Sequence, residues 1–327
     1  MHMHNDLLTN ARVAVLGGAG FIGKSLVQRL SGAVDLIRVV DKSLGFSHSS
    51  PPNNTEFYDA DVRDSEKIGR AVKNCSVIFN LVGQGGHLES MDSPLADLES
   101  NVCAQLTILE ACKAHAPGSH VIFASTRQVY GAPEFLPVPE HHPANPLDVN
   151  GINKLTAERY HLLYSRLCGI RSTVLRLTNT YGPGMRTTGP NSTFLGTWIR
   201  QVLDGKPIRI FGDGSSVRDM THVDDVVHAF IKTACTPLKT ANEIFNVGSG
   251  VSVSLRQIAE QLISLLNYRT EIEFCPFPNL LERIDIGNYV ADTTKFNKRT
   301  AWSAETPLAH GLRATLESFG LLNSSAP

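Results

Sequence analysis

The sequence lacks several features that would assign it to a specialised class of protein. Its six cysteines, at positions 75, 103, 112, 168, 235 and 275, are scattered, and no two have the C-x-x-C spacing of metal or redox sites. Thirty basic and 31 acidic residues leave a formal charge of −1, which gives no electrostatic reason to expect nucleic acid or an anionic membrane as partner. We therefore expect reduced thiols and no metal site.

Long apolar runs are also missing. No stretch approaches the ~20 apolar residues that cross a bilayer, and residues 1–18 lack the charged start and long apolar core of a secretory signal. With 42% hydrophobic and 19% charged residues, the composition is that of an ordinary globular protein. We expect a cytoplasmic protein without a membrane partner, and 327 residues are enough for two packed sub-domains.

The first half of the chain alternates short β-branched runs with amphipathic helical patterns. Strands are predicted at 12–17, 37–41, 55–62, 76–83, 120–126 and 172–179, and helices lie between them, among others at 96–115 and 153–169. This alternation is typical of β-α-β units and predicts an α/β fold with a doubly wound parallel sheet. After about residue 180 the chain turns to loops rich in Gly, Pro, Thr and Ser, which indicates a second, smaller lobe.

A glycine-rich turn links the first predicted strand to the first helix. Gly17, Gly20 and Gly23 form a G-x-x-G-x-x-G pattern around Phe21 and Ile22. Glycines there let the backbone approach a pyrophosphate, whose charge lies at the helix N-terminus. The pattern predicts a Rossmann-type dinucleotide site.

The end of the second predicted strand indicates which dinucleotide binds. Asp41 stands where a carboxylate accepts hydrogen bonds from the ribose hydroxyls and repels a 2′-phosphate. This favours NAD as cofactor, although Lys42 leaves NADP open. Asp61 and Val62, at the end of the third predicted strand, are expected beside the adenine.

Eight motifs in order give a resemblance that runs nearly end to end. They are "GGAGFIG", "NVCAQLTILEA", "FASTRQVYG", "PLDVNGINKLTAER", "LRLTNTYGP", "GDGSSVRDMTHVDDVV", "IFNVGSG" and "YVADTTKFNKRTAWSAET". Together they resemble the extended short-chain dehydrogenase/reductase family, specifically its nucleotide-sugar epimerases and dehydratases. The resemblance implies an NAD-binding domain (1–178 and 217–248) and a smaller, interleaved domain (179–216 and 249–327) that binds a nucleoside-diphosphate sugar. It also implies a homodimer paired through the helices at 96–115 and 153–169.

The resemblance assigns roles position by position. Thr126 matches the catalytic Ser/Thr, and Lys154 matches the lysine that holds the nicotinamide ribose. Further expected cofactor contacts are Leu81, Val82, Gly83 and Asn101. The expected substrate contacts are Gln84, Thr126, Asn179, Thr193, Phe211, Arg218 and Arg283, of which Asn179, Arg218 and Arg283 would hold the diphosphate, because an arginine fork suits phosphate oxygens.

Two departures from the family pattern concern proton transfer. Asn150 stands four residues before Lys154, where most of the family has a tyrosine that removes a proton from the sugar, and a carboxamide cannot do this. Arg127-Gln128 replaces the Asp-Glu pair of the dehydratases, which disfavours dehydration and decarboxylation. His87, in the loop predicted at 82–94, is a candidate replacement base, and Asn150 is a candidate for holding a water in the proton path.

Three hypotheses follow. The favoured one is an NAD-dependent nucleotide-sugar epimerase that works through a transient keto-sugar. The second is an NAD(P)H-dependent reductase of a keto-sugar nucleotide, or another activity of the dehydratase family. The third is a non-catalytic binder of sugar nucleotides.

Overall fold

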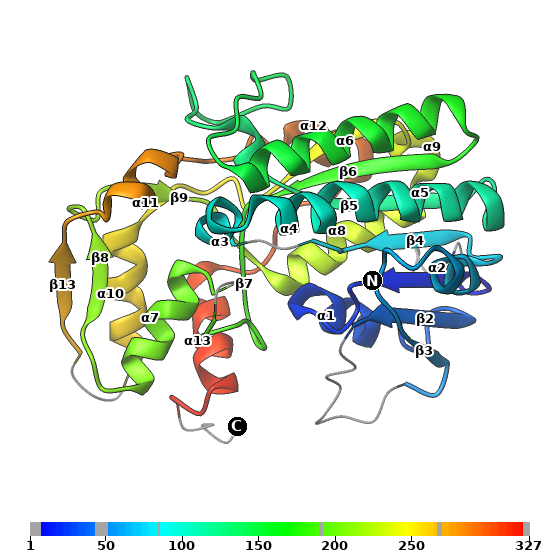
Figure 1. Ribbon diagram of the computed structural model, residues 1–327. Helices are drawn as coiled ribbons and strands as arrows, with labels where there is room; N and C mark the ends of the chain where they lie inside the picture. The colour runs from blue at the N-terminus through cyan, green and yellow to red at the C-terminus, as the bar shows by residue number, and fades with distance from the viewer. Residues whose placement is uncertain (1–7, 43–51, 84–85, 190–191, 267–269, 323–327) are drawn as a thin grey trace.

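The structure is a computed structural model that describes residues 8–42, 52–83, 86–189, 192–266 and 270–322. Its centre is a seven-stranded, fully parallel sheet in the order β11-β6-β5-β4-β1-β2-β3 (Figure 1). The strands are β1 (Arg12–Leu16), β2 (Leu36–Asp41), β3 (Thr55–Asp59), β4 (Val77–Asn80), β5 (His120–Thr126), β6 (Arg171–Leu177) and β11 (Glu243–Val247). The predicted α/β fold with a doubly wound parallel sheet is confirmed.

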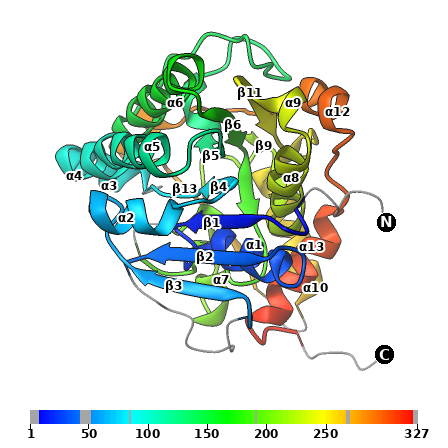
Figure 2. The ribbon, with the colours of Figure 1, turned by 90° about the vertical axis from the view of Figure 1, so that its right-hand side faces the viewer.

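The helices fall into two groups, one that covers both faces of this sheet and one that lies beyond its edge (Figure 1). They are α1 (Phe21–Leu30), α2 (Ser65–Val72), α3 (His87–Asp92), α4 (Pro94–Leu98), α5 (Ala104–His115), α6 (Val149–Leu167), α7 (Phe194–Leu203), α8 (Val223–Cys235), α9 (Pro237–Thr240), α10 (Leu255–Leu265), α11 (Asn279–Ile284), α12 (Thr294–Thr300) and α13 (Leu308–Ser318), with a π-helical turn η1 (Glu99–Cys103) and a 3-10 turn η2 (Arg127–Tyr130). Figure 2 shows α2, α5 and α6 on one face and α1 and α8 on the other. Within the described residues, no helix is both long and apolar enough to span a bilayer.

Each face of the sheet has its own apolar core, which the sequence periodicity explains. In α1 the buried residues Gly23, Leu26, Val27 and Leu30 recur at three- and four-residue spacing and pack against Val13 and the other strand residues of that face. The opposite core contains Ile68 of α2 and Ile108 of α5. Full burial of such a side chain stabilises the fold by about 1.5–3 kcal/mol.

The observed boundaries differ from the predicted ones at several points. The helix predicted at 96–115 is three consecutive segments, α4, η1 and α5. The helix predicted to begin at 153 begins at Val149, because the side chain of Asp148 caps it by accepting a hydrogen bond from the Gly151 N–H at 2.5 Å. The loop predicted at 82–94 contains α3, and the strand predicted at 172–179 is divided into β6 and a separate short strand, β7 (Asn179–Tyr181).

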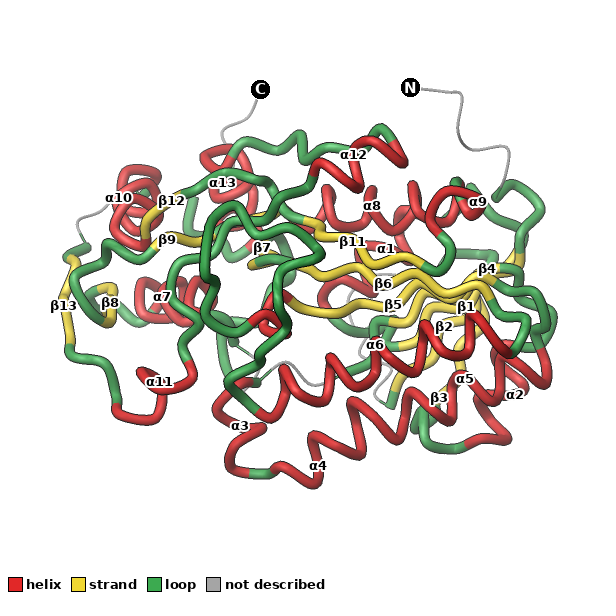
Figure 3. Tube along the Cα trace, turned by 90° about the horizontal axis from the view of Figure 1, so that it is seen from above, coloured by secondary structure: helices red, strands yellow, loops and turns green. Residues whose placement is uncertain are grey.

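The remaining elements gather beyond the edge of the sheet from which α3 emerges (Figure 1, Figure 3). They include α7, α10, α11, α13 and three further two-stranded pairs: β8 (Ile208–Phe211) with β13 (Ile272–Cys275), β9 (Val217–Arg218) with β12 (Val253–Ser254), and β10 (Met220–His222) with β7. A third core, with Trp198, Ile258 and Leu312, holds them together. The chain returns to the large sheet through α8 and β11 before completing this second group.

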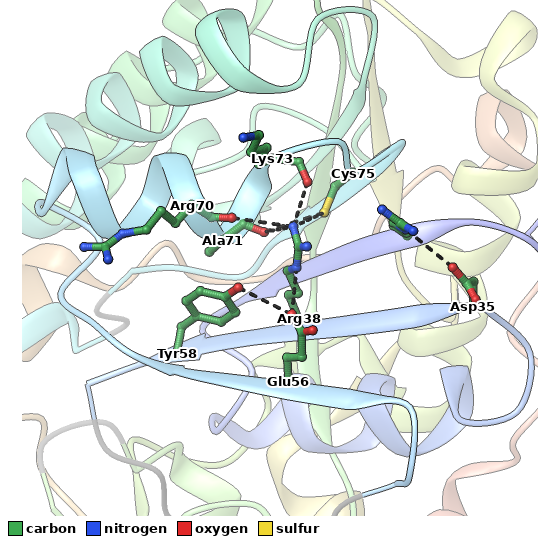
Figure 4. Close-up of polar contacts among 9 residues, drawn as sticks. Asp35, Arg38, Glu56, Tyr58, Arg70, Ala71, Lys73 and Cys75 are labelled. Atoms are coloured by element: carbon green, nitrogen blue, oxygen red, sulfur yellow. Dashed lines mark hydrogen bonds and ion pairs between the residues drawn. The ribbon is translucent and has the colours of Figure 1, made fainter.

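Arg38, on β2, ties the end of α2 to the sheet (Figure 4). Its Nη1 donates to the carbonyl oxygens of Lys73 at 2.6 Å and Ala71 at 3.3 Å, and its Nε lies 3.0 Å from Oε2 of Glu56 on β3. A guanidinium at a helix C-terminus satisfies carbonyls that have no partner within the helix and complements the helix dipole. The contact fixes α2 against its face of the sheet.

Candidate functional site

The glycine turn brings β1, α1 and β4 into close approach. Gly17 has φ +77°, and a Cβ there would lie 3.1 Å from the carbonyl carbon of Leu81, the first residue after β4. A Cβ on Gly23 would lie 2.4 Å from the Gly17 carbonyl oxygen, so no larger residue fits. Gly20 precedes α1, which begins with Phe21 and Ile22. The backbone N–H groups of this helix start are therefore close to the ends of the neighbouring strands, as a pyrophosphate site needs.

Asp41, at the end of β2, faces this turn. Its Oδ2 accepts a hydrogen bond from the Ala19 N–H at 3.0 Å. The carboxylate therefore lies beside the glycine turn, in the position from which a ribose would be bound. This arrangement fits a dinucleotide.

Lys42 and Asp61 form an ion pair next to Asp41. The Lys42 Nζ lies 2.9 Å from Oδ2 of Asp61, and the Arg63 Nη2 lies 2.7 Å from the same oxygen. Hydrogen bonds from Arg63, and secondarily from Lys42, hold the pKa of Asp61 well below its usual range despite partial burial. Val62, between Asp61 and Arg63, is buried. Lys42 is thus paired with Asp61, so its charge is less available to bind the 2′-phosphate of NADP.

Lys154 lies under the loop that follows β4. Its Nζ donates to the carbonyl oxygens of Val82 and Ala124, both at 3.2 Å. A Cβ on Gly83 would lie 2.4 Å from this Nζ and 2.4 Å from Oδ1 of Asn101, so the loop passes directly over both side chains. Burial lowers the pKa of Lys154 to about 8, and the carboxylates of Asp97 and Glu158 oppose this shift. Gly83, Asn101 and Lys154 are therefore brought together, as the resemblance predicts.

Thr126 ends β5 beside this loop. Its Oγ1 accepts a hydrogen bond from the Gln128 N–H at 3.2 Å, which starts the tight turn η2. Lys154 donates to the carbonyl oxygen of Ala124, two residues before Thr126 on the same strand. Thr126 and Lys154 therefore lie at the same edge of the sheet, next to the end of β4.

Asn150 is turned into the protein. Its side chain is 2% exposed, and its Nδ2 donates to Oδ2 of Asp97 at 3.2 Å. The other oxygen of Asp97 accepts from Nδ2 of Asn153 at 2.8 Å, so two amides on α6 share one buried carboxylate on α4. The Asn150 amide thus joins the contact between α4 and α6.

His87 begins α3 and lies next to the start of α6. Its Nδ1 is 2.8 Å from Oδ2 of Asp148, and its side chain is 37% exposed. Gln128 also reaches this carboxylate, with Nε2 donating at 3.2 Å. An aspartate at this position is typical of a helix cap, so the sequence analysis did not identify Asp148 as a site residue. The available indication was that a carboxylate stands two residues before Asn150.

The residues expected to hold the substrate are spread over the second group of elements. Arg218 is 7% exposed; its Nη1 donates to the Gly287 carbonyl at 2.8 Å, and its Nη2 lies 3.2 Å from Oδ1 of Asp285. Asn179 begins β7, and its buried Oδ1 accepts no hydrogen bond from the described residues. Arg283 is exposed on α11, which contacts α3.

Two further expected substrate contacts, Thr193 and Phe211, lie elsewhere in the second group of elements. Thr193 is exposed, and its side chain caps α7. Phe211 ends β8 and is 37% exposed, with its ring centroid 5.8 Å from that of Phe277. Gln84 lies outside the described residues.

The structure also brings Arg127, which the sequence analysis did not assign to the site, close to the charge of Arg218. Burial and the nearby charge of Arg218 lower the pKa of Arg127 to about 10. The Arg127 guanidinium carbon lies 5.4 Å from the ring centroid of Tyr289, and its Nη1 is buried without a hydrogen-bond partner among the described residues. The sequence feature that could have indicated this is the position of Arg127 directly after Thr126.

A parallel doubly wound sheet, a glycine turn opposed by a carboxylate, and a buried lysine beside the end of β4 define a dinucleotide-binding enzyme scaffold. Residues 13–248 match the family described as "NAD dependent epimerase/dehydratase family". The chain belongs to this family, and the expectation of NAD is confirmed at that level.

Comparisons with individual proteins support the family match. The UDP-glucose 4-epimerase of Mycolicibacterium smegmatis is 31% identical over 314 residues, covering 94% of this chain and 98% of that protein. The crystal structure of the UDP-glucose 4-epimerase of Thermotoga maritima with UDP-glucose has a TM-score of 0.87 at 30% identity and covers 94% and 98% of the two chains. MoeE5 in complex with UDP-glucose and NAD has a TM-score of 0.83 at 29% identity, with 94% and 98% covered. The chain is an enzyme of the epimerase/dehydratase family.

Proposed function

We propose that the protein is an NAD-dependent nucleotide-sugar epimerase that works through a transient keto-sugar. The observation that carries this proposal is the convergence of Thr126 and Lys154 at one edge of the sheet, where Gly83 passes over Nζ of Lys154. The similarity to UDP-glucose 4-epimerases supports a uridine-diphosphate sugar as the substrate class. When bound, NAD supplies the oxidising power and stores the hydride between the two halves of the reaction.

The residues divide the work as follows. The glycine turn and Asp41 bind the pyrophosphate and ribose of the dinucleotide. Lys154 orients the nicotinamide ribose, and Thr126 donates a hydrogen bond to the oxygen on the reacting carbon. Arg218, Arg283 and Asn179 hold the diphosphate of the substrate, so that the sugar ring is presented to the nicotinamide.

The proposal is tested by identifying what the protein holds and what it turns over. Denaturing the purified protein should release NAD, identifiable by mass together with any bound nucleotide sugar. UDP-glucose and related UDP-sugars are then assayed for inversion by NMR. An epimerase retains its dinucleotide through many turnovers, whereas consumption of one NADH per product would identify the reductase. Binding of both ligands without turnover, and without exchange of ring protons in heavy water, would identify a binder.

We also propose a homodimer paired through α5 and α6, which run side by side (Figure 1). The support is a set of apolar side chains left exposed on α6, Ile152 at 51%, Leu163 at 38% and Leu167 at 74%. They lie on one face of α6, with Leu163 and Leu167 on neighbouring turns and Ile152 three turns earlier, and an exposed apolar face of this kind fits a surface that is buried against a partner. Light scattering should give twice the chain mass of 35.6 kDa, and replacing Leu163 and Leu167 with Glu should give the monomer. The two-domain division and the cytoplasmic location stay predictions.

A further inference from the structure

His87 and Asp148 form a histidine–carboxylate pair at the edge of the sheet where Thr126 lies. The pair joins the first residue of α3 to the capping residue of α6, with 2.8 Å between Nδ1 and Oδ2. Its members are 61 positions apart in the sequence, and Gln128, two residues after Thr126, reaches the same carboxylate oxygen. The pair is therefore built from three elements that also carry the proposed site.

The carboxylate in this pair is fixed and charged. Asp148 is 2% exposed; burial alone would raise its pKa, but the hydrogen bond and charge of His87 and the N–H of Gly151 outweigh burial and lower it. Its Oδ1 is occupied by the Gly151 N–H at 2.5 Å, so Oδ2 remains for the imidazole and Gln128. An ionised carboxylate accepts hydrogen bonds only, which places the imidazole proton on Nδ1 and leaves the lone pair on Nε2.

The position of the imidazole is fixed as well. The Ser90 hydroxyl donates to the carbonyl oxygen of His87 at 2.7 Å and accepts from the backbone N–H of Asn150 at 3.2 Å. This bridge locks the start of α3 to the first turn of α6, one helical turn before Lys154. The ring is still 37% exposed, so Nε2 has access to a ligand while Nδ1 is held.

We propose that His87 accepts and returns the proton of the reacting sugar hydroxyl, and that Asp148 is the residue that positions it. This inference rests on the proposed function. The hydroxyl proton passes to Nε2 of His87, and the electron pair of the O–H bond forms the C=O bond. When NAD is bound, it would take up the hydrogen on the same carbon together with its electron pair, and the reverse transfer would restore the hydroxyl. The imidazolium formed meanwhile is stabilised by Asp148 at 2.8 Å.

This assignment explains why Asn150 does not need an ionisable group. Asn150 is 2% exposed and its amide binds Asp97, whereas His87 is accessible and carries a basic nitrogen. In this proposal the proton acceptor lies in the first turn of α3 and not in the first turn of α6.

Other charged groups lie on the elements packed around His87. They are Glu89 and Asp92 on α3 itself, Asp97 on α4, Asp148 on α6, Arg127 on η2, and Glu282 and Arg283 on α11. Among the charged groups of the described residues, only Asp148 lies within 4.0 Å of an imidazole nitrogen, and the neutral Gln128 has its Nε2 3.3 Å from Nδ1. Substitutions in the His87–Asp148 pair should therefore alter the pH dependence of the chemical step.

The experiment compares His87→Asn and Asp148→Asn with Asp92→Asn, an exposed change on the same helix. The wild type and all variants are loaded with NAD, and kcat and KM for UDP-glucose are measured across pH. A single-turnover assay then follows the rate of reduction of bound NAD at 340 nm. Asparagine at 148 keeps a side-chain cap for α6, so folding is retained. His87→Ala is assayed with added imidazole.

We expect kcat to fall about 100- to 10,000-fold in His87→Asn, with KM changed only a few-fold, and added imidazole to restore part of the His87→Ala rate. Asp148→Asn should lose about tenfold or more in kcat. The pH profile of kcat in His87→Asn should differ from that of the wild type. Asp92→Asn should match the wild type.

The outcomes separate the two proposals. A wild type that epimerises while His87→Asn keeps its rate and pH profile overturns the role of His87 and leaves the proposed function standing. A wild type that reduces NAD without inverting the sugar overturns epimerisation, and the 340 nm rates of the variants then decide on His87. A wild type that does neither with UDP-glucose and a panel of UDP-sugars overturns both.

Discussion

The side-chain amide of Asn150 donates to the carboxylate of Asp97 at 3.2 Å, and both side chains are almost fully buried. The residue that stands where relatives are expected to carry a catalytic phenol is therefore part of the contact between α4 and α6. Asn153 donates to the second oxygen of the same carboxylate. Because a buried carboxylate is costly unless it is hydrogen-bonded, this trio depends on each of its members.

A tyrosine introduced at position 150 should not make the enzyme more active. Asn150→Tyr must place a ring where the amide now packs and leaves one oxygen of Asp97 with one fewer donor, so we expect a loss of roughly 1–3 kcal/mol in stability and lower activity. Urea unfolding and kcat measure the two effects. The double variant Asn150→Tyr/Asp97→Ala removes the buried charge and makes space, and it should recover part of the lost stability. Higher kcat in the single variant would mean that Asn150 merely stands in for the phenol.

Lys154 should make folding stability depend on alkaline pH. Its pKa is lowered to about 8 by burial, against an ordinary value of 10.5. The folded protein releases this proton near pH 8 while the unfolded chain holds it to about pH 10.5, so rising pH favours the folded state across this window. Relative to Lys154→Met, the wild type should gain roughly 1–3 kcal/mol between these limits, measured by urea unfolding at several pH values. A constant difference would contradict the lowered pKa. The variant should also lose most of its activity.

Glu158, one turn after Lys154, should be essential for folding. Its carboxylate accepts from Nε and Nη2 of Arg176 at 2.9 and 2.6 Å and from the Ser125 hydroxyl at 2.5 Å, and neither charged side chain exceeds 3% exposure. Glu158→Ala leaves a buried guanidinium without its partner, so we expect a loss of about 3–5 kcal/mol. Arg159→Ala, at the next and exposed position, is the matched control and should change stability by less than about 0.5 kcal/mol. Equal melting temperatures would refute this account.

Arg218 should govern affinity for the nucleotide sugar. Arg218→Lys removes the planar fork and should raise KM about 10- to 100-fold while kcat changes little, because the diphosphate lies away from the reacting carbons. Asp285 now occupies Nη2 of this arginine at 3.2 Å and would compete with a diphosphate. Asp285→Asn should therefore lower KM, and an unchanged KM in both variants would remove Arg218 from the substrate site.

Local patterns were enough to predict the fold and the cofactor end of the site. A glycine turn, a strand-ending carboxylate and alternating elements are features of neighbouring residues, and the structure places Gly17, Gly23 and Asp41 together as expected. Thr126 and Lys154 came from the resemblance; Thr126 ends β5, and Lys154 reaches the same strand from α6 by donating to the Ala124 carbonyl oxygen.

The proton path could be only partly predicted, because it depends on contacts between distant segments. His87 was proposed for its chemistry, but Asp148 was not proposed, because nothing local indicates that α3 would fold against it. That Asn150 holds a water stays a prediction, and the structure adds the bond from its amide to Asp97, a residue 53 positions away. The start of α6 was missed for a related reason, since the cap at Asp148 outweighs the weak helix preference of the residues that follow.

The π-helical turn η1 gives the long segment from Pro94 to His115 two angular phases. One extra residue per turn rotates everything beyond it by about 100° relative to an uninterrupted α-helix. Before the turn, Asp97 points at α6; within it, Asn101 reaches Gly83; after it, Ile108 faces the sheet core. A single-residue deletion here would act as a twist of one half against the other, and would break either the support of Asn150 or the packing of α5 while leaving the composition of the segment nearly unchanged.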